Sequence, residues 1–106
     1  MYISNIQKER KMFNDIDDNY KLIHIRIYQR NGRKSITTIE GINDDLDFKK
    51  IIKYMKRNFK CNGKVIIDNT LGNIIQLQGD QRYIVKNFLL DMCIVSDKKY
   101  IRIHGF

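Results

Sequence analysis

The segment from Leu22 to Ile42, LIHIRIYQRNGRKSITTIEGI, decides the fold of this chain. In its first half Ile23, Ile25 and Ile27 alternate with polar or amphipathic residues, which is the period of a strand with one buried face. Its second half, SITTIEG, is rich in β-branched residues that suit a pleated surface. The Asn-Gly pair at 31–32 lies between the two halves and tolerates the positive φ angles of a type I′ turn. The segment therefore predicts an antiparallel hairpin.

An amphipathic helix is expected after this hairpin. Its apolar residues recur at helical spacing, with Asn43 or Asp44 as the N-cap and Gly63 as the terminating residue. These apolar residues are Phe48, Ile51, Ile52, Met55 and Phe59. The segments KVIID and NIIQLQ then predict two short strands joined by the tight turn NTLG.

A second helix and a last strand complete the pattern. Asp80 is the expected N-cap of this helix, whose apolar face repeats Ile84, Val85, Phe88, Leu89 and Met92. The closing segment KYIRIHGF predicts a strand with Ile101 and Ile103 on one side and Tyr100, Arg102 and His104 on the other.

The expected order of elements is ββαββαβ, with each helix apolar on one side only. This order indicates an α+β fold, a two-layer sandwich in which both helices pack on one face of a five-stranded sheet. At 106 residues the chain is long enough for one compact domain and too short for two. We place that domain at residues 21–106. Residues 1–20 show no sustained period and are expected to form a flexible N-terminal tail.

The charge of the chain is strongly positive, with 20 Lys and Arg against 12 Asp and Glu. Residues 1–20 carry three cations and four anions, so the remaining 86 residues carry seventeen cations and eight anions, a net charge of +9. Such an imbalance favours a polyanionic partner, either nucleic acid or an anionic membrane. The chain has neither a stretch of about 18 uninterrupted apolar residues nor a signal-peptide pattern, so we expect a soluble intracellular protein.

The residues that could carry chemistry do not form a recognisable motif. Cys61 and Cys93 form no C-x-x-C, so both are expected to be reduced, and with His24 and His104 they lack the spacing of zinc ligands. An N-cap role explains Asp80 better than a general-base role does. Neither histidine has a Ser or Cys nucleophile in the same motif, and the sequence contains no phosphate-binding loop. We therefore expect no metal, no cofactor and no enzymatic activity.

Six cations cover the face of the first helix opposite its apolar residues: Lys49, Lys50, Lys53, Lys56, Arg57 and Lys60. One interpretation is a solvated face whose charges suit the helix dipole, since Asp44, Asp45 and Asp47 precede the cations. The other is an RNA-binding surface that also includes Arg30, Arg33 and Lys34 of the hairpin turn. The helix has no acid after Asp47 for i,i+4 pairing, which favours an RNA partner.

The open face of the sheet is a further candidate, because aromatic and basic side chains on such a face can stack single-stranded bases. On the predicted alternation this face carries His24, Arg26, Tyr28, Tyr100, Arg102 and His104. The same residue types also suit a half-exposed sheet, and no RNP-like GFGF signature occurs. Both interpretations of this face stay open.

Four blocks of the sequence, HIRIYQRNGRKSITTIEGI, CNGKVI, GNIIQLQGDQR and HGF, together resemble the eukaryotic translation initiation factor 1 family. The resemblance runs in order from about Lys21 to Phe106. It implies a cytoplasmic, monomeric factor without catalysis or cofactor that binds the small ribosomal subunit, with its 18S rRNA, beside the P site. The implied role is to promote scanning of mRNA and to enforce start-codon choice, together with initiator tRNA and other initiation factors.

The resemblance also implies site residues. The hairpin loop Arg30, Asn31, Gly32, Arg33 and Lys34 would reach mRNA and initiator tRNA in the decoding region, and the six cations of the first helix would contact rRNA. The loop Asp68, Asn69, Thr70, Leu71, Gly72 and Asn73 would face initiator tRNA and hinder its full accommodation. Asp80, Gln81 and Arg82 are included as additional contacts.

Two rival functions remain. The chain could be a general RNA-binding module of the same fold, or a divergent copy that modulates translation. It could also be a scaffold for other factors that uses the acidic-aromatic segment MFNDIDD and does not need the basic helix. The loop at residues 68–73 is less acidic than is usual in the family, and the tail is shorter and differently composed.

Overall fold

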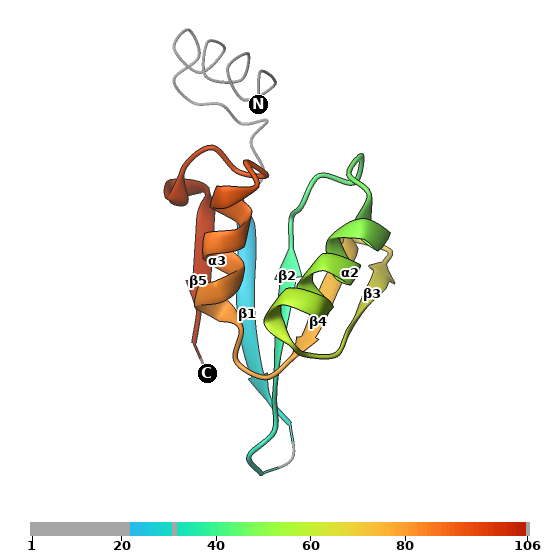
Figure 1. Ribbon diagram of the computed structural model, residues 1–106, viewed down its shortest axis with the longest axis vertical. Helices are drawn as coiled ribbons and strands as arrows, with labels where there is room; N and C mark the ends of the chain where they lie inside the picture. The colour runs from blue at the N-terminus through green and yellow to red at the C-terminus, as the bar shows by residue number, and fades with distance from the viewer. Residues whose placement is uncertain (1–21, 31, 106) are drawn as a thin grey trace, which may run out of the picture.

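The computed structural model describes residues 22–30 and 32–105 and has an α+β fold in two layers (Figure 1). Its strands are β1 (Ile23–Gln29), β2 (Ser35–Glu40), β3 (Gly63–Asp68), β4 (Gly72–Gln78) and β5 (Ile101–His104). Its helices are α2 (Phe48–Phe59) and α3 (Arg82–Asp91), with a 3₁₀ helix η1 (Lys98–Tyr100) before β5. The predicted order and fold class are confirmed. The predicted tail at residues 1–20 lies outside the described residues, so the domain boundary stays a prediction.

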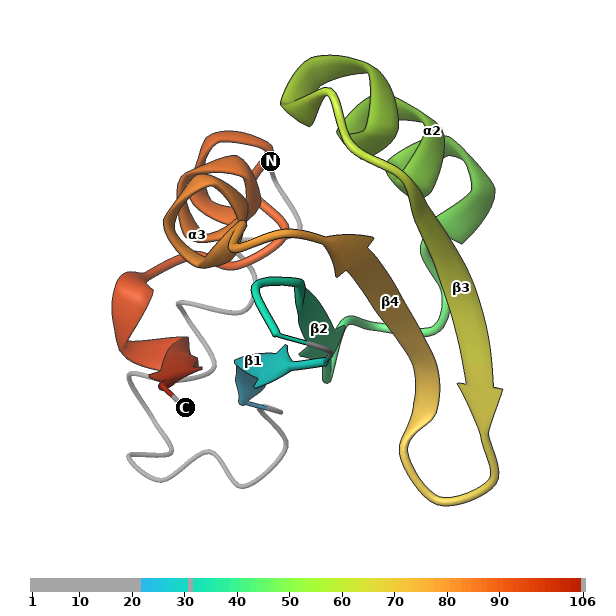
Figure 2. The ribbon, with the colours of Figure 1, turned by 90° about the horizontal axis from the view of Figure 1, so that it is seen from below.

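The sheet has the strand order β3-β4-β2-β1-β5. The β1–β2 hairpin is its centre, because β2 also pairs antiparallel with β4 and β1 pairs in parallel with β5. Both helices cover the same face of the sheet, as the two perpendicular views show (Figures 1 and 2). Among residues 22–30 and 32–105, no helix covers the other face of the sheet, which we call the open face.

The core lies between this sheet and the two helices. Alternate strand residues point into it, among them Ile25, Ile39 and Ile75, which are fully buried. Met55 of α2 and Leu89 of α3 are also fully buried and close the core from the helix side. The period of two in the strands and the helical spacing of the apolar residues therefore meet in one cluster.

The ends of α2 differ from the prediction. Asp47, and not Asn43 or Asp44, is the N-cap, because its side chain accepts a 3.2 Å hydrogen bond from the backbone N–H of Lys50. The helix ends at Lys60, which adopts a left-handed conformation with φ of 53°. Gly63 instead begins β3, where an added Cβ would lie 2.6 Å from Leu77 Cδ2. That glycine is required by close packing of two strands and not by helix termination.

The ends of α3 and β5 also correct the prediction. Gln81, and not Asp80, occupies the N-cap position of α3, although the Asp80 carboxylate accepts a 3.3 Å hydrogen bond from the backbone N–H of Arg82 at the start of the helix. Of the predicted apolar face, Ile84 and Met92 are 48% and 46% exposed instead of buried. Tyr100 belongs to η1 and is buried, so it does not lie on the open face of the sheet.

Candidate nucleic-acid interface

The loop between β1 and β2 projects beyond the end of the sheet (Figure 1). The predicted hairpin is confirmed, because β1 and β2 pair antiparallel up to Gln29 and Ser35. The backbone N–H of Arg30 donates a 2.7 Å hydrogen bond to the carbonyl of Lys34 at the base of the turn. The register sets the length of this turn, because Ile27 lies opposite Thr37 and both face the core. A two-residue turn would shift this pairing by one residue and move the buried side chains of β2 to the open face.

This loop presents its cations to solvent. Arg30, Arg33 and Lys34 are all exposed, and Gly32 adopts a φ of +61°. The side chain of Gln29 donates a hydrogen bond to the carbonyl of Gly32, which fixes the loop from inside. Asn31 lies outside the described residues. The loop is thus a short basic projection that an internal hydrogen bond stabilises.

The cations of α2 form the second basic feature. All six, Lys49, Lys50, Lys53, Lys56, Arg57 and Lys60, are exposed, as the sequence predicts. Within residues 22–30 and 32–105 none of them forms an ion pair with an acid, whereas Arg26 and Arg82 each do. A solvated face with alternating signs would satisfy its own charges on the helix. This face leaves its positive charge available to an external anion.

The C-terminal end of α2 lies at the same end of the sheet as the hairpin loop (Figure 1). The backbone N–H of Gly79 donates to the carbonyl of Ser35 (2.9 Å), and that of Gln78 donates to the carbonyl of Asn62 (2.9 Å). These bonds join the base of the hairpin to the segment after α2 across the end of β4. Two hollows lie on this side, one lined by Arg30, Arg33, Lys34, Ser35, Ile36, Gln78 and Gly79 and one by Ile52, Lys53, Lys56, Arg57, Cys61 and Asn62. We call the three loop cations and the six α2 cations the basic surface.

The segment from Asp80 to Arg82 is held next to this surface, but its charges are satisfied internally. The guanidinium of Arg82 donates two hydrogen bonds of 2.8 Å to the two carboxylate oxygens of Asp80. The hydrogen bonds from Arg82 lower the pKa of Asp80. The side chain of Gln81 donates to the carbonyl of Gln78 (3.1 Å). The segment therefore adds little free charge to the basic surface.

The loop from Asp68 to Asn73 lies at the opposite end of the sheet from the basic hairpin loop (Figure 1). The carboxylate of Asp68 accepts hydrogen bonds from the backbone N–H groups of Leu71 (2.9 Å) and Thr70 (2.8 Å), and these bonds lower its pKa. Leu71 is 49% exposed at the tip. The structure thus brings the hairpin loop toward the C-terminal end of α2. This third predicted segment lies beside the residues that lead into α2, where the Asn73 side chain donates a 3.2 Å hydrogen bond to the Asp44 carboxylate.

The open face of the sheet carries a pair that sequence reasoning missed. His24 Nδ1 and His104 Nε2 are 3.0 Å apart, and the two rings stack with centroids 5.2 Å apart. Arg26 on the same face forms a 3.1 Å salt bridge with Glu40. No local signal marks the histidine pair, because it depends on the parallel pairing of β1 with β5. Four polar side chains on this face are therefore engaged in two pairs.

The described residues provide little for metal or covalent chemistry. Within them, no group of three or more His, Cys, Asp or Glu side chains gathers in a way that could hold a metal ion. Cys61 and Cys93 are free and half-buried, and burial raises the pKa of the Cys61 thiol. Over the same residues, no helix has both the length and the apolar character needed to span a bilayer.

Comparison with known proteins identifies relatives over most of the chain. The family model described as Translation initiation factor SUI1 matches residues 19–95. The protein translation factor SUI1 homolog of Oryza sativa subsp. indica is 54% identical over 84 residues, which cover 79% of this chain and 72% of that protein. The eukaryotic translation initiation factor eIF-1 of Saccharomyces cerevisiae is 51% identical over 84 residues, or 79% of this chain and 77% of that protein.

A solved structure shares the fold. The C-terminal domain of human eIF2D aligns with a TM-score of 0.64 at 19% sequence identity. The alignment covers 77% of this chain and 42% of that longer chain. This likeness concerns the fold alone.

Proposed function

This chain belongs to the SUI1 family of translation initiation factors, acts in translation initiation and is not an enzyme, and on that premise we propose its specific role. It binds the small ribosomal subunit near the P site, promotes scanning of mRNA and enforces start-codon choice by hindering premature accommodation of initiator tRNA. Its partners are 18S rRNA, mRNA, initiator tRNA and other initiation factors. It works as a monomer in the cytoplasm.

The basic surface is the observation that carries this proposal. Its six α2 cations have no acid partner in the described part of the chain, and its loop cations project from the end of the sheet toward which α2 runs. Such cations bind a polyanion by displacing the counterions condensed on its phosphates. If about six phosphates are neutralised, the logarithm of the affinity should fall with the logarithm of the salt concentration with a slope of roughly −4.

The proposed mechanism is competition for space. The α2 cations dock the domain on rRNA, and the loop of Arg30, Gly32, Arg33 and Lys34, together with Asn31, reaches toward the mRNA and tRNA. The loop from Asp68 to Asn73 lies at the far end of the sheet, so one docked domain could meet initiator tRNA there while α2 holds rRNA. Correct codon pairing then supplies the free energy that seats the tRNA and displaces the factor. Asp80, Gln81 and Arg82 contribute mainly by holding the hairpin base.

Cosedimentation with purified small ribosomal subunits tests the proposal. The chain should pellet with the subunit and remain bound when naked RNA is added in excess. A general RNA-binding module would be competed off by that RNA, and a scaffold for other factors would not pellet with the subunit alone. Either of those results would replace the proposed role by the corresponding rival function.

A further inference from the structure

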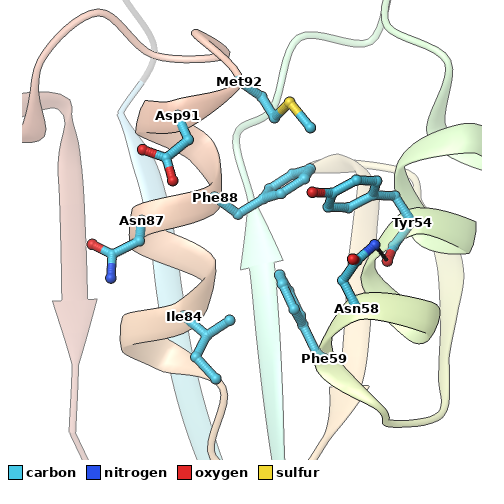
Figure 3. Close-up of a pocket in the computed structure, with 8 residues that line it drawn as sticks. All are labelled: Tyr54, Asn58, Phe59, Ile84, Asn87, Phe88, Asp91 and Met92. Atoms are coloured by element: carbon cyan, nitrogen blue, oxygen red, sulfur yellow. Dashed lines mark hydrogen bonds between the residues drawn. The ribbon is translucent and has the colours of Figure 1, made fainter.

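A groove between α2 and α3 is lined mainly by apolar side chains and lies on the side of the molecule away from the sheet (Figure 3). Tyr54 and Phe59 of α2 line one wall, and Ile84, Phe88 and Met92 of α3 line the other. The groove has a volume of about 270 Å³, which a few apolar side chains fill. Its lining includes Ile84 and Met92, the two residues that the helical pattern wrongly predicts to be buried.

The floor of this groove is a packed aromatic cluster. The rings of Tyr54 and Phe88 have centroids 5.1 Å apart, and the ring of Phe59 meets that of Phe88 edge to face at 5.8 Å. Phe88 is only 7% exposed, so the two helices hold the floor in place. A preformed floor of this kind needs little rearrangement when a ligand binds.

The rim of the groove exposes apolar side chains beside the polar Asn58, Asn87 and Asp91. Tyr54, Ile84 and Met92 expose 41%, 48% and 46% of their surface. Contiguous exposed apolar side chains on a small domain mark an interaction site, whereas scattered ones do not. Two helices that flank an apolar channel form the surface on which a third helix packs through residues at i, i+3, i+4 and i+7.

The charges beside the groove are asymmetric. On α2, Lys50 lies one turn before Tyr54, and the helix has no acid from Phe48 to Phe59. Arg57 lines the hollow on the hairpin side of α2 instead. The α3 wall contributes Asp91 as its acid. The Asn58 amide is already used, because it donates a 2.9 Å hydrogen bond to the carbonyl of Tyr54 (Figure 3). A bound segment therefore meets positive charge along α2 and an acid on α3.

We infer that this groove binds an amphipathic helix of a partner protein, whose apolar face fills the groove between α2 and α3 and whose acidic flank faces Lys50. The docking site is distinct from the hairpin loop and stands whether or not the chain binds a ribosomal subunit. It gives the domain a protein-binding surface that shares Lys50 with its basic surface.

Designed peptides of about 18 residues, long enough to form a helix, serve as probes for the full chain. The first carries Leu at i, i+3, i+4 and i+7 with Glu on one flank, the second has Lys in place of Glu, and the third is a scrambled Glu peptide without the apolar stripe. We expect fluorescence anisotropy to show saturable binding of the first, and binding about tenfold or more weaker for the other two. Equal binding of the scrambled peptide would mean that charge alone attracts it and would overturn the inference.

Variants locate the site. Ile84→Asn with Met92→Gln should weaken the Glu peptide about tenfold, whereas Ile67→Gln, at an 80% exposed isoleucine on β3, should leave binding unchanged. Lys50→Glu should weaken the Glu peptide and strengthen the Lys peptide. Circular dichroism checks that each variant is folded. If the groove variant binds like the parent, the groove is not the site.

Other occupants give different results. A dimer that forms with rising concentration and is lost in the groove variant would assign the groove to a second copy of the chain. Release of the peptide by single-stranded RNA, together with loss of RNA binding in Ile84→Asn with Met92→Gln, would assign it to RNA. Either result would overturn the proposal.

Discussion

Thr37 and Gly79 lie 42 residues apart in the chain, and the buried hydroxyl of Thr37 donates a 2.7 Å hydrogen bond to the carbonyl of Gly79. The same hydroxyl accepts a 2.9 Å hydrogen bond from the backbone N–H of Gln81. One side chain on β2 therefore satisfies two backbone groups of the segment that leads into α3. Because Gly79 also bonds to Ser35, this contact fixes the base of the basic hairpin relative to α3.

Thr37→Val should destabilise the domain. Valine has nearly the same shape but cannot donate or accept, so the carbonyl of Gly79 and the N–H of Gln81 lose their partner in a buried place. Each unsatisfied group costs about 1–3 kcal/mol, and we expect the free energy of unfolding to fall by about 2–4 kcal/mol. Urea denaturation followed by circular dichroism measures the change. Thr37→Ser keeps the hydroxyl and is the control, and a Val variant no less stable than the Ser variant would contradict the role given to Thr37.

Lys53→Glu with Lys56→Glu should weaken binding to the small subunit at least about tenfold and make its salt dependence shallower by about one unit of slope per lost phosphate contact. The matched control is Lys98→Glu with Lys99→Glu, which changes the net charge equally at exposed residues of η1. Filter binding over a range of salt concentrations separates the two variants. If both weaken binding alike, net charge and not the α2 face governs affinity.

Replacing residues 31–33 with Asn-Gly tests the hairpin loop. A type I′ turn can follow directly on the pair of Arg30 and Lys34, so the register of β1 and β2 and the fold should be retained. The shorter loop loses Arg33 and part of its reach. In a reconstituted initiation assay we expect initiation at near-cognate codons to rise several-fold. Arg33→Ala at full loop length separates charge from length, and unchanged stringency in both variants would exclude the loop from start-codon discrimination.

The fold could be predicted from sequence because its signals are local. Alternation in the strands and helical spacing in α2 follow directly from which side chains are buried, and both appear within a few residues. No local signal determines the length of the turn, because this length depends on which residue of β2 lies opposite Ile27. The same holds for Gly63, whose small size is required by the backbone carbonyl of Gln76 and the side chain of Leu77 on β4, and by Ile52 of α2.

The basic surface was predictable as a set of residues but not as an arrangement. Helical spacing alone places the α2 cations away from the core, and they are exposed as expected. The position of the C-terminal end of α2 beside the hairpin base depends on bonds from Gln78 and Gly79 that link distant segments. The groove was hidden for a similar reason. Ile84 fits an apolar helical face, and only the spacing between α2 and α3 leaves it exposed.

Acidification should weaken the domain through His24. Burial is the largest cause that lowers the pKa of His24, and the nearby positive charge of Arg26 is the second. Glu40 raises this pKa, whereas His104 and Arg102 have smaller effects that lower it. The unfolded chain therefore takes up the proton first. Stability is fully present above the ordinary histidine pKa of about 6.5 and is lost as pH falls from there through the lowered folded-state pKa.

His24→Gln should remove this contribution, so its free energy of unfolding should fall less than that of the parent between about pH 7 and about pH 5. Urea denaturation at several pH values measures the two slopes, and an NMR titration of the His24 ring gives the pKa directly. Glu40→Gln supplies a test of sign: it removes the one neighbour that raises the pKa of His24, so the titration should move to still lower pH. Equal slopes for the parent and His24→Gln, or a higher His24 pKa in Glu40→Gln, would mean that the electrostatics of the open sheet face differ from those described for the pair of His24 and His104.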